Sequence, residues 1–77
     1  MNKERRKQLE KALELIGDAM EIIENAKDDE QDAYDNLPEG IQYSERGEQM
    51  SDNVDNLESV ISDIESAVEN LNEVIDS

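Results

Sequence analysis

Apolar residues recur every seven positions along two stretches of the chain, on either side of a single proline. The first stretch starts at Leu9 and alternates spacings of four and three residues as far as Ile23. The second stretch runs in the same way from Met50 to Ile75. This alternation is typical of α-helices whose apolar stripe packs against another helix, as in coiled coils. The pattern therefore predicts an all-α protein built from two long amphipathic helices.

The segment between the two stretches is expected to break the helix. Pro38 disfavours helical backbone at Leu37, and Gly40 adds a flexible joint. Ser44 is a favourable N-cap residue for the helix that follows. The single domain 1–77 is therefore expected to contain a first helix over about 3–35, a loop over 36–43 and a second helix over about 44–76.

The apolar stripes of the two helices match each other if the chain reverses direction near Gly40. Facing residues then have numbers that sum to about 80, which pairs Leu9 with Leu71 and Ile16 with Ile64. This agreement predicts an antiparallel two-helix coiled-coil hairpin.

Two further contacts are expected from this pairing. The ring of Tyr34 would lie opposite Gly47, the one seam position without a side chain. The basic start of the first helix would lie beside the acidic end of the second, where exposed ion pairs contribute up to about 1 kcal/mol each. The residues concerned are Lys3, Arg5 and Arg6 on one helix and Glu69, Glu73 and Asp76 on the other.

Two charged residues, Lys27 and Glu30, interrupt the first apolar stripe near the loop. Long side chains can extend past the edge of a core while their aliphatic parts remain packed, which would fix the helix register. Alternatively, this half of the hairpin is looser and presents a binding surface. Arg46 lies one turn from Met50 and is placed to pair with Glu30.

Each helix also carries a third apolar column beside its stripe. A two-helix seam buries only about two positions per heptad, so this column would be partly exposed in a lone hairpin. We expect a second copy of the chain to cover it, which gives a homodimeric four-helix bundle. The alternative is a groove for a helix of another protein. The columns are Ala12, Ala19, Ala26 and Ala33, widened by Leu15 and Ile22, in the first helix and Val60, Ala67 and Val74 in the second.

The composition excludes several kinds of chemistry. The 77 residues include no Cys and no His, which excludes thiol nucleophiles, imidazole bases, disulfides and Cys/His zinc sites. The carboxylates lie in no recognisable pocket-forming context. We therefore expect no catalytic residue, no metal site and no cofactor. No apolar run is long enough for a membrane span, and no signal peptide is recognisable, so we expect a cytoplasmic protein without a membrane partner.

The net charge of −15 results from 22 acidic and 7 basic residues, and the whole excess lies in residues 28–77. A field of this sign repels phosphate backbones, so direct nucleic-acid binding is not expected. The acidic face of the second helix is either a solvated surface, a docking surface for a protein, or an imitation of the phosphate track of DNA. The candidate residues on it are Glu45, Glu48, Asp52, Asp55, Glu58, Asp63 and Glu65.

The tip of the hairpin is a second candidate binding surface. It gathers both tyrosines of the protein together with apolar residues and one cation. Tyrosine and arginine are frequent anchors of protein interfaces. The alternative is that these side chains only close the end of the bundle. The tip residues are Tyr34, Leu37, Ile41, Tyr43 and Arg46.

The segment from Asp35 to Gln42 (DNLPEGIQ), with the following SERGE over residues 44–48 and a later DNLE, resembles a segment of small acidic helical-hairpin proteins of Gram-positive bacteria and their prophages. The resemblance extends along nearly the whole chain and carries over no catalytic residue. It implies a phage or mobile-element setting, in which small acidic proteins often bind and inhibit host proteins.

Three functions remain open at this point. The chain is a non-catalytic binding protein that docks through its tip or acidic face, a DNA mimic that blocks a nucleic-acid enzyme or defence complex, or a structural bundle whose only partner is itself. We favour the first, with an unidentified protein as partner and a second copy of the chain as companion.

Overall fold

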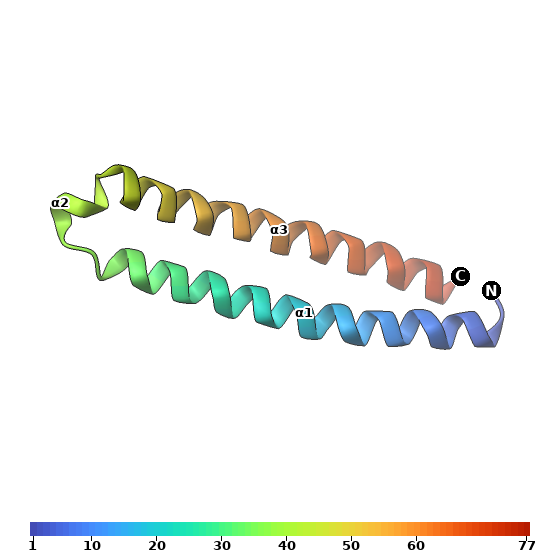
Figure 1. The fold of residues 1–77 in the computed structure, drawn as a ribbon. Coiled ribbons are helices and arrows are strands. Elements are labelled where there is room, and N and C mark those ends of the chain that lie inside the picture. The colour runs from blue at the N-terminus through green and yellow to red at the C-terminus, as the bar shows by residue number, and fades with distance from the viewer.

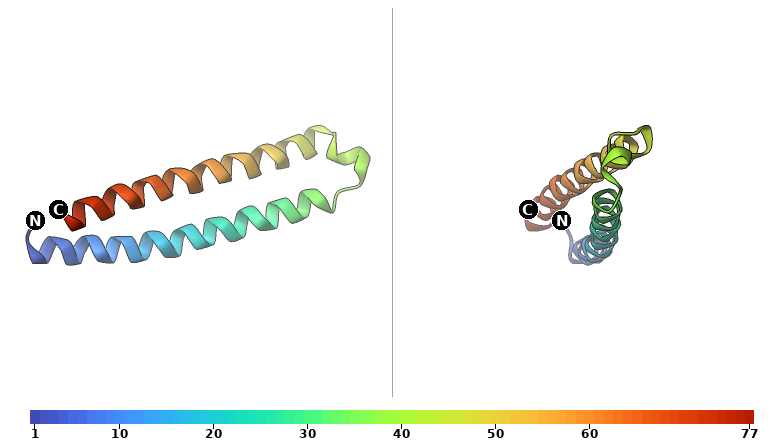
Figure 2. Two further views of the ribbon diagram at one scale, coloured as in Figure 1. Left: turned by 180° about the vertical axis from the view of Figure 1, so that it is seen from behind. Right: turned by 90° about the vertical axis from the view of Figure 1, so that its left-hand side faces the viewer.

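A computed structural model describes residues 1–77 and shows two long antiparallel helices joined by a short helical connection (Figure 1). The helices are α1, Lys3–Asp35, α2, Glu39–Gln42, and α3, Glu45–Asp76. Both ends of the chain lie at the same end of the molecule (Figure 2). The Cα atoms extend over 58 × 16 × 12 Å, and their radius of gyration is 17.4 Å, against about 11 Å for a compact domain of this length. The predicted helical hairpin is confirmed.

The ends of the long helices are set by local capping. The side chain of Asn2 accepts a hydrogen bond of 2.9 Å from the backbone N–H of Arg5 at the start of α1. Ser44 caps α3 in the same way, accepting from the N–H of Gly47 at 3.4 Å. Each contact satisfies one of the backbone donors that a helix start leaves unpaired. The predicted N-cap at Ser44 is therefore confirmed.

The predicted loop over 36–43 contains a helical turn, α2, that the sequence pattern did not reveal. Pro38 precedes the turn with a φ of −55°, which is already close to the helical value. Its carbonyl oxygen accepts the N–H groups of Ile41 and Gln42 at 2.8 and 3.1 Å. Gly40 is not a special joint, because no glycine in the chain has a positive φ and a Cβ there would meet no neighbouring atom.

The core is a thin seam between α1 and α3. Val54 and Ile61 of α3 are its only buried apolar residues, with 5% and 8% of their surface exposed. Both lie on the side of α3 that packs against α1. Most other seam residues are half-buried, since one partner helix covers only one side of each side chain. A lone hairpin therefore buries little of its apolar surface, as expected for so small a domain.

Gly47 allows the connection to pack closely against α3. A Cβ at this position would overlap the backbone of α2, at the carbonyl oxygens of Ile41 and Gln42. The atoms nearest to this position thus belong to the backbone of α2 and not to the ring of Tyr34 that was expected opposite Gly47. Tyr34 contributes its carbonyl oxygen instead, which accepts a hydrogen bond of 3.2 Å from Nε2 of Gln42.

Two glycine substitutions test this packing with opposite expected signs. Gly47→Ala forces α2 away from α3, and we expect it to lower the free energy of unfolding by about 1 to 3 kcal/mol. Gly17→Ala meets no neighbouring atom and replaces a glycine inside a helix, so it should raise stability by up to about 1 kcal/mol. Urea unfolding followed by circular dichroism measures both. A neutral Gly47→Ala variant would show that α2 does not pack as described.

Candidate functional site

The candidate sites of this protein are surfaces. The structure has no enclosed pocket and no group of acidic side chains placed to hold a metal ion. Neither long helix contains a stretch with the length and hydropathy that a bilayer-spanning helix needs. Three surfaces are candidates: the side of the hairpin that carries the apolar columns, the exposed acids of α3, and the tip.

Both apolar columns lie on the same side of the hairpin. We use heptad letters, with position a at Leu13 and Met20 in α1 and at Val54 and Ile61 in α3; position g is the residue before each a, and position c lies two residues after it. The g positions of a helix lie about 90° to one side of its seam. The second helix runs in the opposite direction and also faces the first across the seam. Each of these two changes would move its g positions to the other side of the hairpin, and together they cancel. The g positions of two antiparallel helices therefore lie on the same side. The alanine column of α1 and the valine-alanine column of α3 thus form one surface, which we call the uncharged face.

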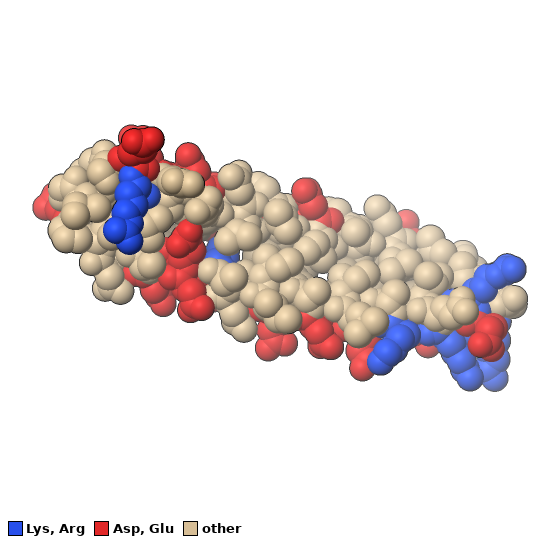
Figure 3. All heavy atoms as spheres, viewed as in Figure 1, with Lys and Arg blue, Asp and Glu red and all other residues tan.

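The uncharged face exposes large apolar side chains. Leu15 and Ile22 lie at c positions of α1 and are 57% and 69% exposed, while Val60 and Val74 of α3 are more than two-fifths exposed. Three of the four alanines of the α1 column are also exposed. Figure 3 shows a band of uncharged side chains along the middle of one face, with acidic side chains along both of its edges. The expected exposure of these columns in a single hairpin is confirmed.

Charged residues are rare on the uncharged face although they make up 38% of the chain. The g and c positions of α1 and α3 hold only four of them, two acids and two cations: Arg5, Asp29, Arg46 and Asp63. The remaining positions of α3 on this side are mostly amides and small apolar residues, such as Gln49 and Asn56. The face is thus electrically neutral on a protein of net charge −15. Depletion of charge is characteristic of the central part of protein interfaces.

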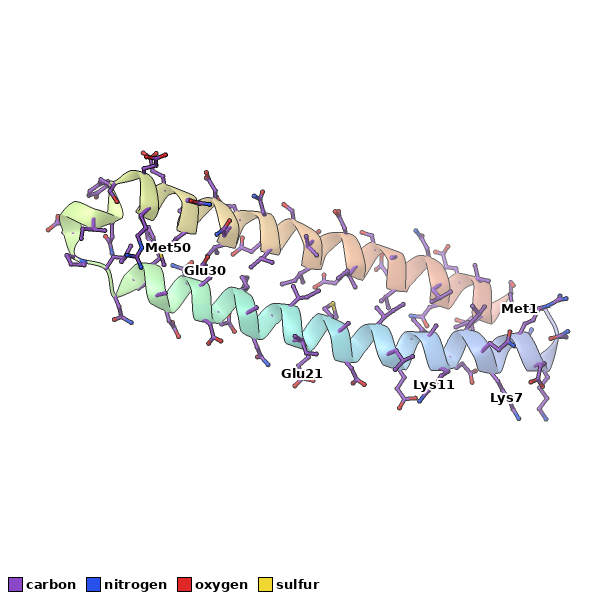
Figure 4. All side chains as sticks on the ribbon, in the orientation of Figure 1. Met1, Lys7, Lys11, Glu21, Glu30 and Met50 are labelled. Atoms are coloured by element: carbon purple, nitrogen blue, oxygen red, sulfur yellow. The ribbon has the colours of Figure 1, made fainter.

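The two charged residues within the seam make polar contacts at its edge. The side chain of Lys27 is 26% exposed, and its Nζ lies 3.6 Å from the carboxylate of Asp28. Glu30 accepts a hydrogen bond of 2.9 Å from Nδ2 of Asn53 in α3. Figure 4 places Glu30 beside Met50 between the two helices. These contacts fit the interpretation that the long side chains extend past the core edge.

The expected pairing of Arg46 with Glu30 is wrong, because the structure contains no ion pair between them. The expected ion pairs between the basic start of α1 and the acidic end of α3 are also absent; the two ion pairs of the structure are Lys11–Glu14 and Lys27–Asp28. Glu69, Glu73 and Asp76 occupy heptad positions that point away from α1, and Arg6 donates from Nη2 to the carbonyl oxygen of Ser77 at 2.9 Å instead. Lys7 and Lys11 likewise point away from α3 (Figure 4).

The seven acidic candidates of α3 are all exposed, and none of them is in an ion pair. Their heptad positions distribute them around the helix rather than along one line. Glu45, Glu48, Asp52 and Asp55 form a row on the outside of α3, which we call the outer row. Glu58 and Glu65 face the side opposite the uncharged face, whereas Asp63 lies at the edge of the uncharged face itself. The acids expected to form one face of α3 are therefore spread over several sides of the helix. The outer row is where they are most closely spaced.

The tip residues separate into packed and exposed members. Tyr34 and Leu37 are half-buried, which agrees with a role in closing the end of the hairpin. Ile41 and Tyr43 are exposed, the latter to 76% of its surface. Arg46 is exposed as well. The structure therefore reduces the candidate anchors at the tip to Ile41, Tyr43 and Arg46.

Reasoning from the sequence found both apolar columns but missed that they coincide on one side. The sequence did contain this information, because the residues of both columns come directly before the a positions of their own helices. It becomes informative only when combined with the antiparallel direction of the helices. The chain matches no protein-family model, no curated protein and no solved structure.

The unpaired acids of α3 predict an unusual response of stability to salt. The ten acids of this helix face one cation, so their repulsion opposes folding and is screened as ionic strength rises. We expect the melting temperature to increase by several degrees between about 0.02 M and about 0.3 M sodium chloride. Thermal melts followed by circular dichroism measure this change. A melting temperature that falls steadily over the same range would contradict this description of the surface.

Proposed function

We propose that the chain is a non-catalytic protein-binding module that docks its acidic surface on a basic surface of another protein. The observation that carries this proposal is the set of exposed, unpaired carboxylates on α3. Because these groups are already in water and have no cation beside them, a basic partner gains their attraction at little desolvation cost. The resemblance of the tip segment to phage-associated proteins supports a cytoplasmic host protein as partner and inhibition as the result.

The outer row is the part of this surface best suited to a basic partner. Its four acids follow one another at spacings of three and four residues, which corresponds to about 5 Å along the helix. A rigid helix holds them in place before binding, so little conformational entropy is lost on association. The exposed Tyr43 and Ile41 at the adjoining tip would add an apolar anchor beside this charged surface.

The same row is the feature that favours the second candidate function, imitation of DNA. Phosphates follow one another every ~3.4 Å along one strand of a duplex, so a line of carboxylates at a comparable spacing would suit a groove that normally holds DNA. The two functions share the acidic surface and differ in the partner. Competition by duplex DNA distinguishes them.

Self-association completes the proposal. We propose that two hairpins pair through their uncharged faces into a four-helix bundle, which leaves the outer rows and the tips of both copies accessible. Pairing would remove Leu15 and Ile22 from water, and each fully buried side chain of this kind contributes about 1.5 to 3 kcal/mol. A structural bundle with no partner other than itself would need only this pairing.

Charge reversal tests the role of the outer row. We expect the triple variant Glu48→Lys, Asp52→Lys and Asp55→Lys to capture no specific protein from a lysate of a Gram-positive host, whereas the unchanged chain retains one. The matched control, Glu14→Lys, Asp18→Lys and Glu21→Lys, makes the same change of charge on the outside of α1 and should retain it. Capture should also weaken steeply between about 0.1 M and about 0.5 M salt. Equal loss in both triple variants would refute a specific role for the outer row.

Two further comparisons separate the alternatives. Release of the captured protein by added duplex DNA would favour imitation of DNA. Loss of capture in Ile41→Ala with Tyr43→Ala, but not after charge reversal, would move the site to the tip.

The solution mass tests the pairing. Sedimentation equilibrium should give a mass near twice the 8.8 kDa of the chain. Ile22→Glu places a charge on the uncharged face and should yield a folded monomer, while Asn25→Glu adds the same charge on the outside of α1 and should remain dimeric. A monomer at all concentrations would refute pairing and leave the uncharged face open to a helix of another protein.

A further inference from the structure

We infer that the two hairpins of the proposed bundle lie with their tips at opposite ends, and that α1 packs against α1 of the second copy. This inference rests on the proposed self-association and adds its orientation and register. Three features of the molecule support it: the exposed area, the distribution of charge along the rod, and the order of residues on the uncharged face.

The hairpin exposes more surface than a compact monomer of the same mass. The hairpin exposes 5718 Å², whereas a compact monomer of the same mass exposes about 4,800 Å². The excess of about 900 Å² is close to the roughly 800 Å² that each partner buries in a standard interface. The uncharged face extends along the 58 Å rod and is long enough to account for it.

The occupant of this face is better matched by a second copy than by a basic amphipathic helix. A basic partner would require acids beside the apolar columns, but the c positions of α3 hold three amides and only one acid, Asp63. The face instead carries equal numbers of acids and cations. A neutral face that is complementary to itself suits an interface between identical copies, in which each residue meets its counterpart through a two-fold axis.

The distribution of charge favours opposite tips. Residues 28–60, the tip half, contain eleven acids and one cation, which gives a net charge of −10. With both tips at one end, two such halves would lie side by side and repel each other. With tips at opposite ends, each tip half lies beside the open half of the other copy, residues 1–27 and 61–77, whose net charge is −5. Repulsion between the two copies is therefore weaker in the second arrangement.

The order of residues along α1 supports the same arrangement. A two-fold axis that places the tips at opposite ends sets α1 antiparallel to α1 of the second copy, so that facing residues have numbers with a constant sum. At a sum of 34, Ala12 faces Ile22 of the second copy and Leu15 faces Ala19 of the second copy. A large side chain then meets a small one at each level, which is the arrangement that fills an interface without gaps.

The charged residues of α1 agree with this register. Arg5 and Asp29 are the only charged residues on the uncharged face of α1, and their numbers also sum to 34. Each would therefore face the other in the second copy, at both ends of the interface. The one like-charge contact is Asp63, which comes opposite its own counterpart at the edge of the face, near the axis.

The alternative arrangement, with tips together, pairs the faces less well. It sets α1 against α3 of the second copy at the same level of the rod. Leu15 would then lie beside Asp63 and Ala67, and Ile22 beside Asn56 and Val60. Each of these large apolar side chains would then be buried partly against a polar group, which is unfavourable when that group has no hydrogen-bond partner.

Opposite tips give the bundle a tip at each end and an outer row on each side. One dimer could then engage two copies of a partner, or two sites of one assembly, and gain affinity from simultaneous binding. This arrangement would make the bundle a bivalent binding protein.

Engineered cysteines test the orientation directly, because the chain contains no cysteine. In the double variant Ala12→Cys with Ile22→Cys the two thiols lie about 15 Å apart on one helix, so they cannot join within a chain. If the tips lie at opposite ends, the cysteine at position 12 lies beside the cysteine at position 22 of the second copy. Mild oxidation should then convert most of the protein to a covalent dimer on non-reducing gels. Ala12→Cys alone should remain uncrosslinked.

A mixture of Ala12→Cys and Ala67→Cys single variants provides the opposite test, since these positions meet between copies only when the tips lie together. Cross-linking in this mixture, but not in the Ala12→Cys and Ile22→Cys double variant, would overturn the orientation while leaving self-association intact. A wild-type monomer in sedimentation would overturn both.

A charge swap provides a second readout that does not depend on oxidation. Asp29→Arg should weaken the dimer about tenfold, because it places arginines opposite each other at two sites. Adding Arg5→Asp should restore the affinity, and the control Asp32→Arg, on the outside of α1, should leave the dimer at least as tight as wild type. If the double swap fails to restore what Asp29→Arg removes, the proposed register is wrong.

Discussion

Two helices can bury only the side chains along their line of contact, and this limit shapes the whole molecule. The seam between α1 and α3 buries Val54 and Ile61 and leaves most of its other residues half-exposed. Each helix nevertheless carries three apolar columns rather than two. The surplus is concentrated on one side, where Leu15 and Ile22 remain largely in water. The hairpin thus has more apolar surface than its own fold can cover, which is the physical basis for proposing a second copy.

Charge is arranged around this apolar surface. The acids gather on the outside of both helices and at the tip half, and the uncharged face remains neutral. If charge served only solubility, there would be no reason for it to avoid one side of α3 and crowd the others. The same partition separates two roles on one small rod: a neutral face suited to burial, and acidic surfaces suited to electrostatic attraction of a partner.

The connection between the helices contributes to this division by holding the tip in one conformation. Pro38 starts a short helical turn, α2 packs on the bare backbone of Gly47, and Gln42 bonds to the last turn of α1. A packed connection presents Ile41 and Tyr43 as fixed, exposed side chains. It also fixes the direction in which α3 leaves, and so maintains the register along the seam.

The sequence by itself determined the helices, their approximate ends and their antiparallel pairing. These features depend on local rules, since a heptad repeat, a proline and an N-cap serine act within a few residues of themselves. Because facing residues have numbers that sum to about 80, the sequence also predicted which residues pair across the seam, such as Leu9 with Leu71. The apolar columns and the acids of α3 were likewise identified as candidate surfaces from residue types and spacing alone.

The tertiary structure decided how these surfaces are oriented around the rod. Whether the alanines of α1 and the valines of α3 share a side depends on the handedness of the helix together with the direction of its partner, which no single stripe contains. The same reason explains why Glu69 and Glu73 miss the cations of α1: they are at the right level but on the wrong side. Contacts of backbone with backbone, such as α2 against Gly47, leave no periodic trace in the sequence and arise only when the chain folds back on itself.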